Sequence, residues 1–114
     1  MVDSIATNQS RWQNQKAQRL QLGDALEVSR PVDQNAYFRS AKSAALVTQE
    51  LESHGFAVTS TRSLFRTHLS ATRDESLKDE SVDAFLRLVV PLIESNGGTY
   101  DGFGGPVVAT AKDA

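Results

Sequence analysis

Between positions 30 and 104 the spacing of apolar residues alternates between the period of a β-strand and that of an α-helix, which limits the folds open to this chain. Residues 30–38, "RPVDQNAYF", alternate apolar with polar side chains, as a half-buried strand does: Val32, Ala36 and Phe38 against Asp33, Asn35 and Tyr37. A helix is predicted next, with Ser40 as its N-cap and Gly55 at its end.

The rest of the pattern completes one recognisable order of elements. Residues 56–62 and 64–73 predict a hairpin with Ser63 near its turn. Residues 74–98 predict a second helix closed by Gly97, and residues 99–104 a last strand. This βαββαβ order predicts an α+β, ferredoxin-like sandwich, with an antiparallel sheet in the order 4-1-3-2 and two helices on one face. The opposite face should be open unless the N-terminal residues cover it.

The apolar positions of these elements predict the core. Its expected members are Val32, Ala36, Phe38, Val47, Leu51, Phe56, Val58, Phe65, Leu69, Phe85, Val89, Leu92 and Ile93.

The N-terminal residues differ from the rest of the chain. We expect residues 1–24 to form a polar, partly helical arm, loosely docked, and residues 25–114 to form the ferredoxin-like domain. Ser10 is the expected helix start and Gly23 its end. Trp12 is the exception in this arm, because a large aromatic side chain needs a place to bury.

Composition limits the possible functions. The formal net charge of -2 argues against a broad phosphate-binding surface, since nucleic-acid-binding domains carry a visible basic excess. With no cysteine, the chain has no disulfide, thiolate metal site or cysteine nucleophile. The start, "MVDSIATNQS", lacks the features of a secretory signal, and Arg87 and Pro91 interrupt the longest apolar run. We therefore expect a cytoplasmic protein.

The segment "GGTYDGFGGPVV" raises two alternatives, an RNA-binding strand and a phosphate loop. The glycine–aromatic motif of RNA-recognition domains belongs on the third strand, whereas this segment is on the fourth. A phosphate loop needs a lysine and a hydroxyl after the glycines, and this segment has no lysine. We interpret the glycines as backbone features and expect Gly102 or Gly104 to have a positive φ or to touch a neighbouring backbone.

Acidic residues cluster ahead of and within the second predicted helix. The cluster consists of Asp74, Glu75, Asp79, Glu80 and Asp83. These acids alone do not predict a metal site, because they lack the spacing of an EF-hand and have no histidine nearby in sequence. Acids at the start of a helix complement its dipole, and we favour that interpretation.

His68 permits a catalytic hypothesis. With Asp33 as orienting acid and Ser70 as nucleophile it would complete a triad, but no "GxSxG" turn is present. A polar sheet face that contacts a partner or solvent is the interpretation we favour.

Three stretches, "RPVDQNAYF", "LESHGF" and "IESNGGTYDGFG", resemble a bacterial family, the regulators of ribonuclease E activity B, RraB. Its members are small ferredoxin-like proteins in which a helix ends in glycine and runs into a "YDGWG" strand. The resemblance covers residues 30–104. Its motif lies at Tyr100, Asp101, Gly102, Phe103 and Gly104, with Phe103 where the family usually has tryptophan.

The resemblance implies an intracellular protein that binds ribonuclease E and restrains RNA cleavage, with no catalytic site, cofactor or metal of its own. We expect a monomer or weak dimer that contacts neither nucleic acid nor membrane directly. The expected contact residues are Asp33, Tyr37, Arg66 and His68 on the open face, with Asp101 and Phe103 at the adjoining strand end. The alternative is a small enzyme or ligand-sensing domain that uses Asp33, Tyr37, Arg66 and His68.

Overall fold

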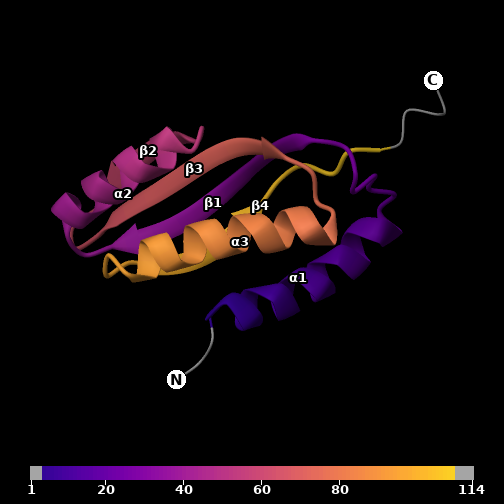
Figure 1. The fold of residues 1–114 in the computed structure, drawn as a ribbon, viewed down its shortest axis with the longest axis horizontal. Coiled ribbons are helices and arrows are strands. Elements are labelled where there is room, and N and C mark those ends of the chain that lie inside the picture. The colour runs from indigo at the N-terminus through magenta and orange to yellow at the C-terminus, as the bar shows by residue number, and fades with distance from the viewer. Residues whose placement is uncertain (1–3, 110–114) are drawn as a thin grey trace.

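The computed structural model describes residues 4–109, which form three helices and one four-stranded antiparallel sheet (Figure 1). The elements are α1 (Ser4–Gln21), β1 (Arg30–Phe38), α2 (Ala41–Ser53), β2 (Ala57–Arg62), β3 (Thr67–Glu75), α3 (Asp79–Glu94) and β4 (Thr99–Gly104). The strands lie in the order β2-β3-β1-β4, which is the predicted order read from the other edge. The α+β class and the ferredoxin-like order are therefore confirmed.

The first crossover helix begins and ends where its capping residues predict. The Ser40 hydroxyl accepts a hydrogen bond of 3.1 Å from the backbone N–H of Ser43. Past the end of α2, Gly55 has a φ of 88°, a left-handed conformation that favours glycine. These two residues mark the ends of α2, so that β1 ends before Ser40 and β2 begins after Gly55.

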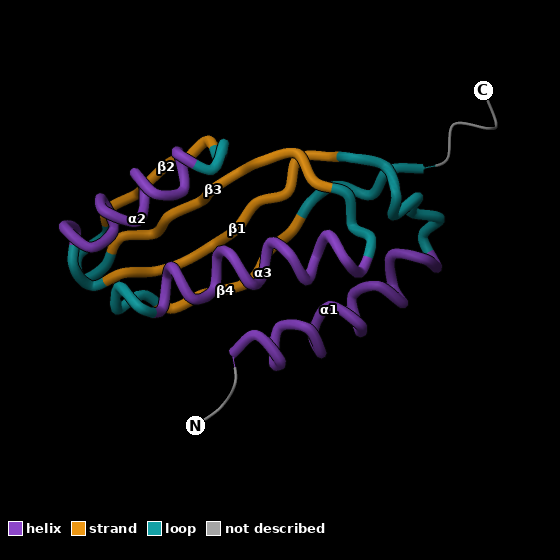
Figure 2. The backbone as a smooth tube through the Cα atoms, viewed as in Figure 1, coloured by secondary structure: helices purple, strands orange, loops and turns teal. Residues whose placement is uncertain are grey.

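The core lies between the sheet and its helices, which run along one face (Figure 2). Most predicted core residues are buried: Val32, Ala36, Phe38, Val47, Leu51, Phe56, Leu69, Phe85, Val89 and Ile93. Val58 and Leu92 are partly buried against this cluster. The alternating burial of β1 leaves the other face of the sheet to the polar side chains.

The prediction for Phe65 is wrong, because its side chain is 79% exposed. β3 begins at Thr67, so Phe65 lies in the hairpin turn and not in the strand. Ser63 closes that turn by donating its backbone N–H to the carbonyl of Arg66 at 2.9 Å. Residues at the tip of such a turn have no neighbouring strand or helix to pack against.

Helix α1 begins at Ser4, so the predicted start at Ser10 is wrong. The helix lies along α3, beside the sheet and away from its open face (Figure 1). Trp12 is only 2% exposed, which confirms that it finds a place to bury. The contact with α3 orders a helix whose own apolar stripe is thin. The division of the chain at residue 24 stays a prediction.

Candidate functional site

The open face of the sheet is built by the pairing of β1 with β3. The register sets Tyr37 opposite His68 and Asp33 opposite Thr72. All four side chains point away from the helices, since they alternate with buried neighbours along each strand.

Tyr37, Arg66 and His68 form one contiguous group on this face. The rings of Tyr37 and His68 lie 4.9 Å apart, and the guanidinium carbon of Arg66 lies 4.2 Å from the centre of the Tyr37 ring. This is the geometry of a cation–π contact. The Nε2 atom of His68 lies 3.2 Å from the Oδ1 atom of Asn35. The structure thus brings three of the predicted contact residues together.

Asp33 does not belong to this group. Its carboxylate accepts a hydrogen bond of 2.6 Å from the Thr72 hydroxyl. Four residues along an extended strand separate Asp33 from Tyr37 by ~13 Å. The side chain that faces His68 is the Asn35 amide and not the Asp33 carboxylate. The triad of Asp33, His68 and Ser70 is therefore not assembled, because the acid lies too far along the strand to orient the histidine.

Phe103, expected at the strand end that adjoins the open face, turns its ring to the helix side of the sheet, and its role as a contact residue stays a prediction. The pairing of β4 with β1 shifts between Asn35 and Ala36, where Asp101 is the extra residue of a bulge. Gly102 has a φ of 103° at this bulge, which an L side chain rarely adopts. The extra residue turns Phe103 toward the helices, whereas strict alternation from Tyr100 would turn it to the open face.

Phe103 instead joins an aromatic row beneath α1 and α3. Its ring lies 4.8 Å from that of Phe85 in an edge-to-face arrangement and 5.9 Å from that of Trp12. Asp101 stays exposed at the sheet edge. The motif "YDGFG" therefore serves packing through both of its aromatic residues.

Tyr100 makes the second inward contact of this motif. Its hydroxyl donates a hydrogen bond of 2.5 Å to the Oε1 atom of Gln34, and both side chains are buried. Burial raises the pKa of Tyr100, because the charged phenolate would be poorly solvated there. This residue stays neutral and holds β4 against β1.

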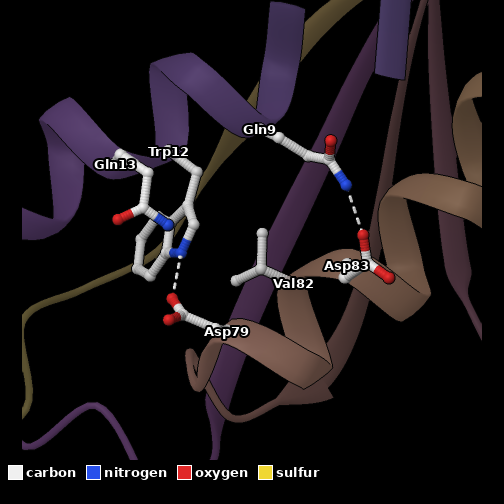
Figure 3. A pocket seen from close by; sticks show the side chains of 6 residues that line it. All are labelled: Gln9, Trp12, Gln13, Asp79, Val82 and Asp83. Carbon is white, nitrogen blue, oxygen red and sulfur yellow. Dashed lines mark hydrogen bonds between the residues drawn. The ribbon is translucent and has the colours of Figure 1, made fainter. Parts of the chain in front are cut away.

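Two members of the acidic cluster, Asp79 and Asp83, join α3 to α1. Figure 3 shows Trp12 directing its indole N–H at Asp79, a hydrogen bond of 2.9 Å, and Gln9 donating to Asp83 across a pocket of about 190 Å³. A hydrogen bond from Lys16, followed by that from Trp12, holds the pKa of Asp79 below its usual range. In residues 4–109 no group of three or more histidine, aspartate or glutamate side chains is arranged to hold a metal ion.

A buried ionic cluster that the sequence patterns did not reveal joins the two ends of the domain. Asp24, with a fully buried side chain, pairs with Arg30 at 2.7 Å and with Arg19 at 2.9 Å. Burial would raise the pKa of Asp24, but the hydrogen bonds from Arg30 and Arg19 outweigh it and hold the pKa below its usual range. The same arginines donate to the carbonyls of Gly105 and Pro106, so the cluster ties α1 to the segment after β4.

Beside the tyrosine group, the hairpin tip exposes the apolar pair Leu64 and Phe65, which sequence reasoning missed. Between the tip and β4 lies a recess of about 190 Å³, whose lining includes Tyr37, Arg39 and Arg66. The sequence signal was available, since two apolar residues between Ser63 and Arg66 occupy the middle of a short turn.

The fold and these surfaces define a small ferredoxin-like protein with an open polar face and a cationic, apolar-tipped end. Comparison with known families matches residues 14–105 to the RraB family, described as "Regulator of ribonuclease activity B". Because the match spans most of the chain, the protein belongs to this family. No curated protein matches the chain. Within the described residues, no helix is long and apolar enough to span a bilayer.

Proposed function

We propose that this protein restrains a ribonuclease E-type endoribonuclease by binding it as a protein partner, without turning over a substrate. The family match over residues 14–105 carries the proposal, because the family is described as one of ribonuclease regulators. Such a protein acts in the cytoplasm, where its target cleaves RNA, as a monomer or weak dimer.

The open face supports a binding role. The group of Tyr37, Arg66 and His68 offers an aromatic and an arginine side chain, the residue types that most often anchor protein interfaces. Asp33 and Asp101 are exposed at the flanks of this group, where they would contribute to a polar rim. The alternative, an enzyme or ligand sensor built on Asp33, Tyr37, Arg66 and His68, gains no support, since Asp33 bonds to Thr72 away from the other three.

A cleavage assay tests the proposal. Purified protein is titrated into a ribonuclease E-type enzyme acting on a labelled RNA, and binding to the same RNA alone is measured in parallel. Inhibition should saturate near equimolar enzyme and weaken in Tyr37→Ala, and the variant should still fold because the side chain lies outside the buried core. An enzyme unaffected at large excess of the protein, or inhibition explained by tight binding to naked RNA, would reject it.

A further inference from the structure

The basic residues of this acidic protein are unevenly paired. Away from the hairpin end, the described basic side chains other than Arg11 have an acidic partner within 4.0 Å: Lys16, Arg19, Arg30, Arg73, Lys78 and Arg87. At the hairpin end, within the described residues, the cations have no such partner: Arg39, Lys42, Arg62 and Arg66. Although the net charge of the protein is -2, its hairpin end therefore carries positive charge that no neighbouring carboxylate in the described part of the chain neutralises.

Three of these arginines are brought together by strand pairing. The Nη1 atom of Arg62 donates to the carbonyl of Arg39 at 3.4 Å and to the Thr67 hydroxyl at 2.8 Å, which fixes its side chain beside the end of β1. Arg39 and Arg66 both line the recess of about 190 Å³ next to Tyr37. A carboxylate in that recess would meet two guanidinium groups, whose forked donors match its two oxygens.

Exposed apolar side chains adjoin this charge. Leu64 is 83% and Phe65 79% exposed, the highest values among the large hydrophobic residues of the described chain. The turn that carries them is closed by two hydrogen bonds, from the backbone N–H and the hydroxyl of Ser63 to the carbonyl of Arg66. The pair is therefore presented on an ordered turn, which lowers the entropy cost of docking against it.

We infer that the hairpin end is the docking surface for an acidic segment of the partner protein that also carries apolar side chains. Carboxylates of that segment enter the recess against Arg39 and Arg66, and its apolar side chains cover Leu64 and Phe65. This inference rests on the proposed function and identifies the part of the surface and the chemistry of the segment bound.

The chemistry of the surface favours a peptide over RNA. Phosphates would also pair with the arginines, but single-stranded RNA needs free aromatic faces on which bases stack. Arg66 covers the ring of Tyr37 and His68 packs 4.9 Å from it, so this tyrosine is engaged within the protein. Phe65 offers one free ring, but its neighbour Leu64 offers apolar area without an aromatic face, so stacked bases would leave Leu64 uncovered. Apolar side chains of a peptide can pack against both Leu64 and Phe65.

The test measures the affinity of two labelled probes for the folded protein. The probes are a peptide of alternating glutamate and leucine and a single-stranded RNA of mixed sequence. Arg39→Glu/Arg66→Glu and Leu64→Ser/Phe65→Ser should each weaken peptide binding roughly tenfold or more. Two matched controls, Lys78→Glu at the start of α3 and Leu20→Ser/Leu22→Ser on exposed positions of α1, should leave peptide binding unchanged.

The outcomes separate this inference from the proposed function. Peptide binding that is absent, insensitive to both tip variants, or weaker than RNA binding at the same arginines would overturn the inference. Ribonuclease inhibition that the tip variants retain in full would overturn it and leave the proposed function standing. A wild-type protein that binds the acidic peptide but never affects the ribonuclease would uphold the surface and reject the proposed function.

Discussion

Replacing Asp24 with alanine should be the most destabilising change to a charged residue in this domain. The carboxylate is fully buried, and its two partners are nearly so, with 1% of the Arg30 side chain and 9% of the Arg19 side chain exposed. Removing it leaves two cations in a space without a counter-charge. Loss of one partner from a buried ion pair costs ~3–5 kcal/mol of the free energy of unfolding. This is a large share of the ~5–15 kcal/mol that stabilises a typical domain.

Urea denaturation monitored by circular dichroism measures this loss, with Lys78→Ala as an exposed control expected to unfold like the parent protein. The same cluster makes the free energy of unfolding depend on pH. Because the pKa of Asp24 is lower in the folded than in the unfolded chain, its contribution is present above about pH 4 and is lost as the pH falls through the folded pKa. Asp24→Asn should therefore flatten the acid side of the stability curve. An Asp24→Ala loss below ~1 kcal/mol would refute the assignment of the cluster as a structural tie.

Three further predictions concern packing around β4. Phe85→Ala should cost ~3–5 kcal/mol, because its ring is 1% exposed, and an unchanged thermal midpoint would exclude this core. Gly102→Ala should cost ~1–3 kcal/mol through its positive φ. An added Cβ atom meets no neighbour among the described residues within 4 Å at either Gly102 or Gly104, but Gly104 has no positive φ, so Gly104→Ala should melt like the parent protein. Equal losses of stability in the two variants would show that the positive φ at the bulge is not the cause. Tyr100→Phe should cost ~1–3 kcal/mol in urea by leaving the buried Oε1 atom of Gln34 unpaired, and a neutral result would show that this bond contributes nothing.

The order of elements and the strand pairing could be predicted because local signals agreed with one another. Ser40 and Gly55 bound the first crossover helix, and the alternation in residues 30–38 assigned each side chain to a face. Tyr37 therefore lies on the open face as expected. Trp12 was expected to be buried because exposing its large aromatic ring to water is unfavourable, and the structure confirms this.

Residue spacing does not show where a strand stops or slips, which explains why Phe65 was placed in the core and why the side chain direction of Phe103 could not be predicted. Phe65 fits the alternation of a longer strand, but the turn closes at Arg66 and leaves the ring in solvent. Phe103 fits the open face until the bulge at Asp101 reverses the side chains that follow. One extra residue changes the face because side chains alternate with a period of two.

The ionic cluster at Asp24 escaped prediction for a different reason. Its members come from the end of α1, the loop after it and the start of β1, and their carbonyl partners follow β4. No spacing rule joins an aspartate to the carbonyls of Gly105 and Pro106 far along the chain. Contacts of this kind depend on the assembled fold and not on local pattern.

Calorimetric titration of the protein into a ribonuclease E-type enzyme, with no RNA present, measures whether the two proteins bind each other. We expect saturable binding with a fixed stoichiometry near one, weakened roughly tenfold or more by Arg39→Glu/Arg66→Glu and unchanged by Lys78→Glu. Absence of heat at concentrations where the enzyme is inhibited, or binding that appears only when RNA is added, would contradict direct recognition of the enzyme.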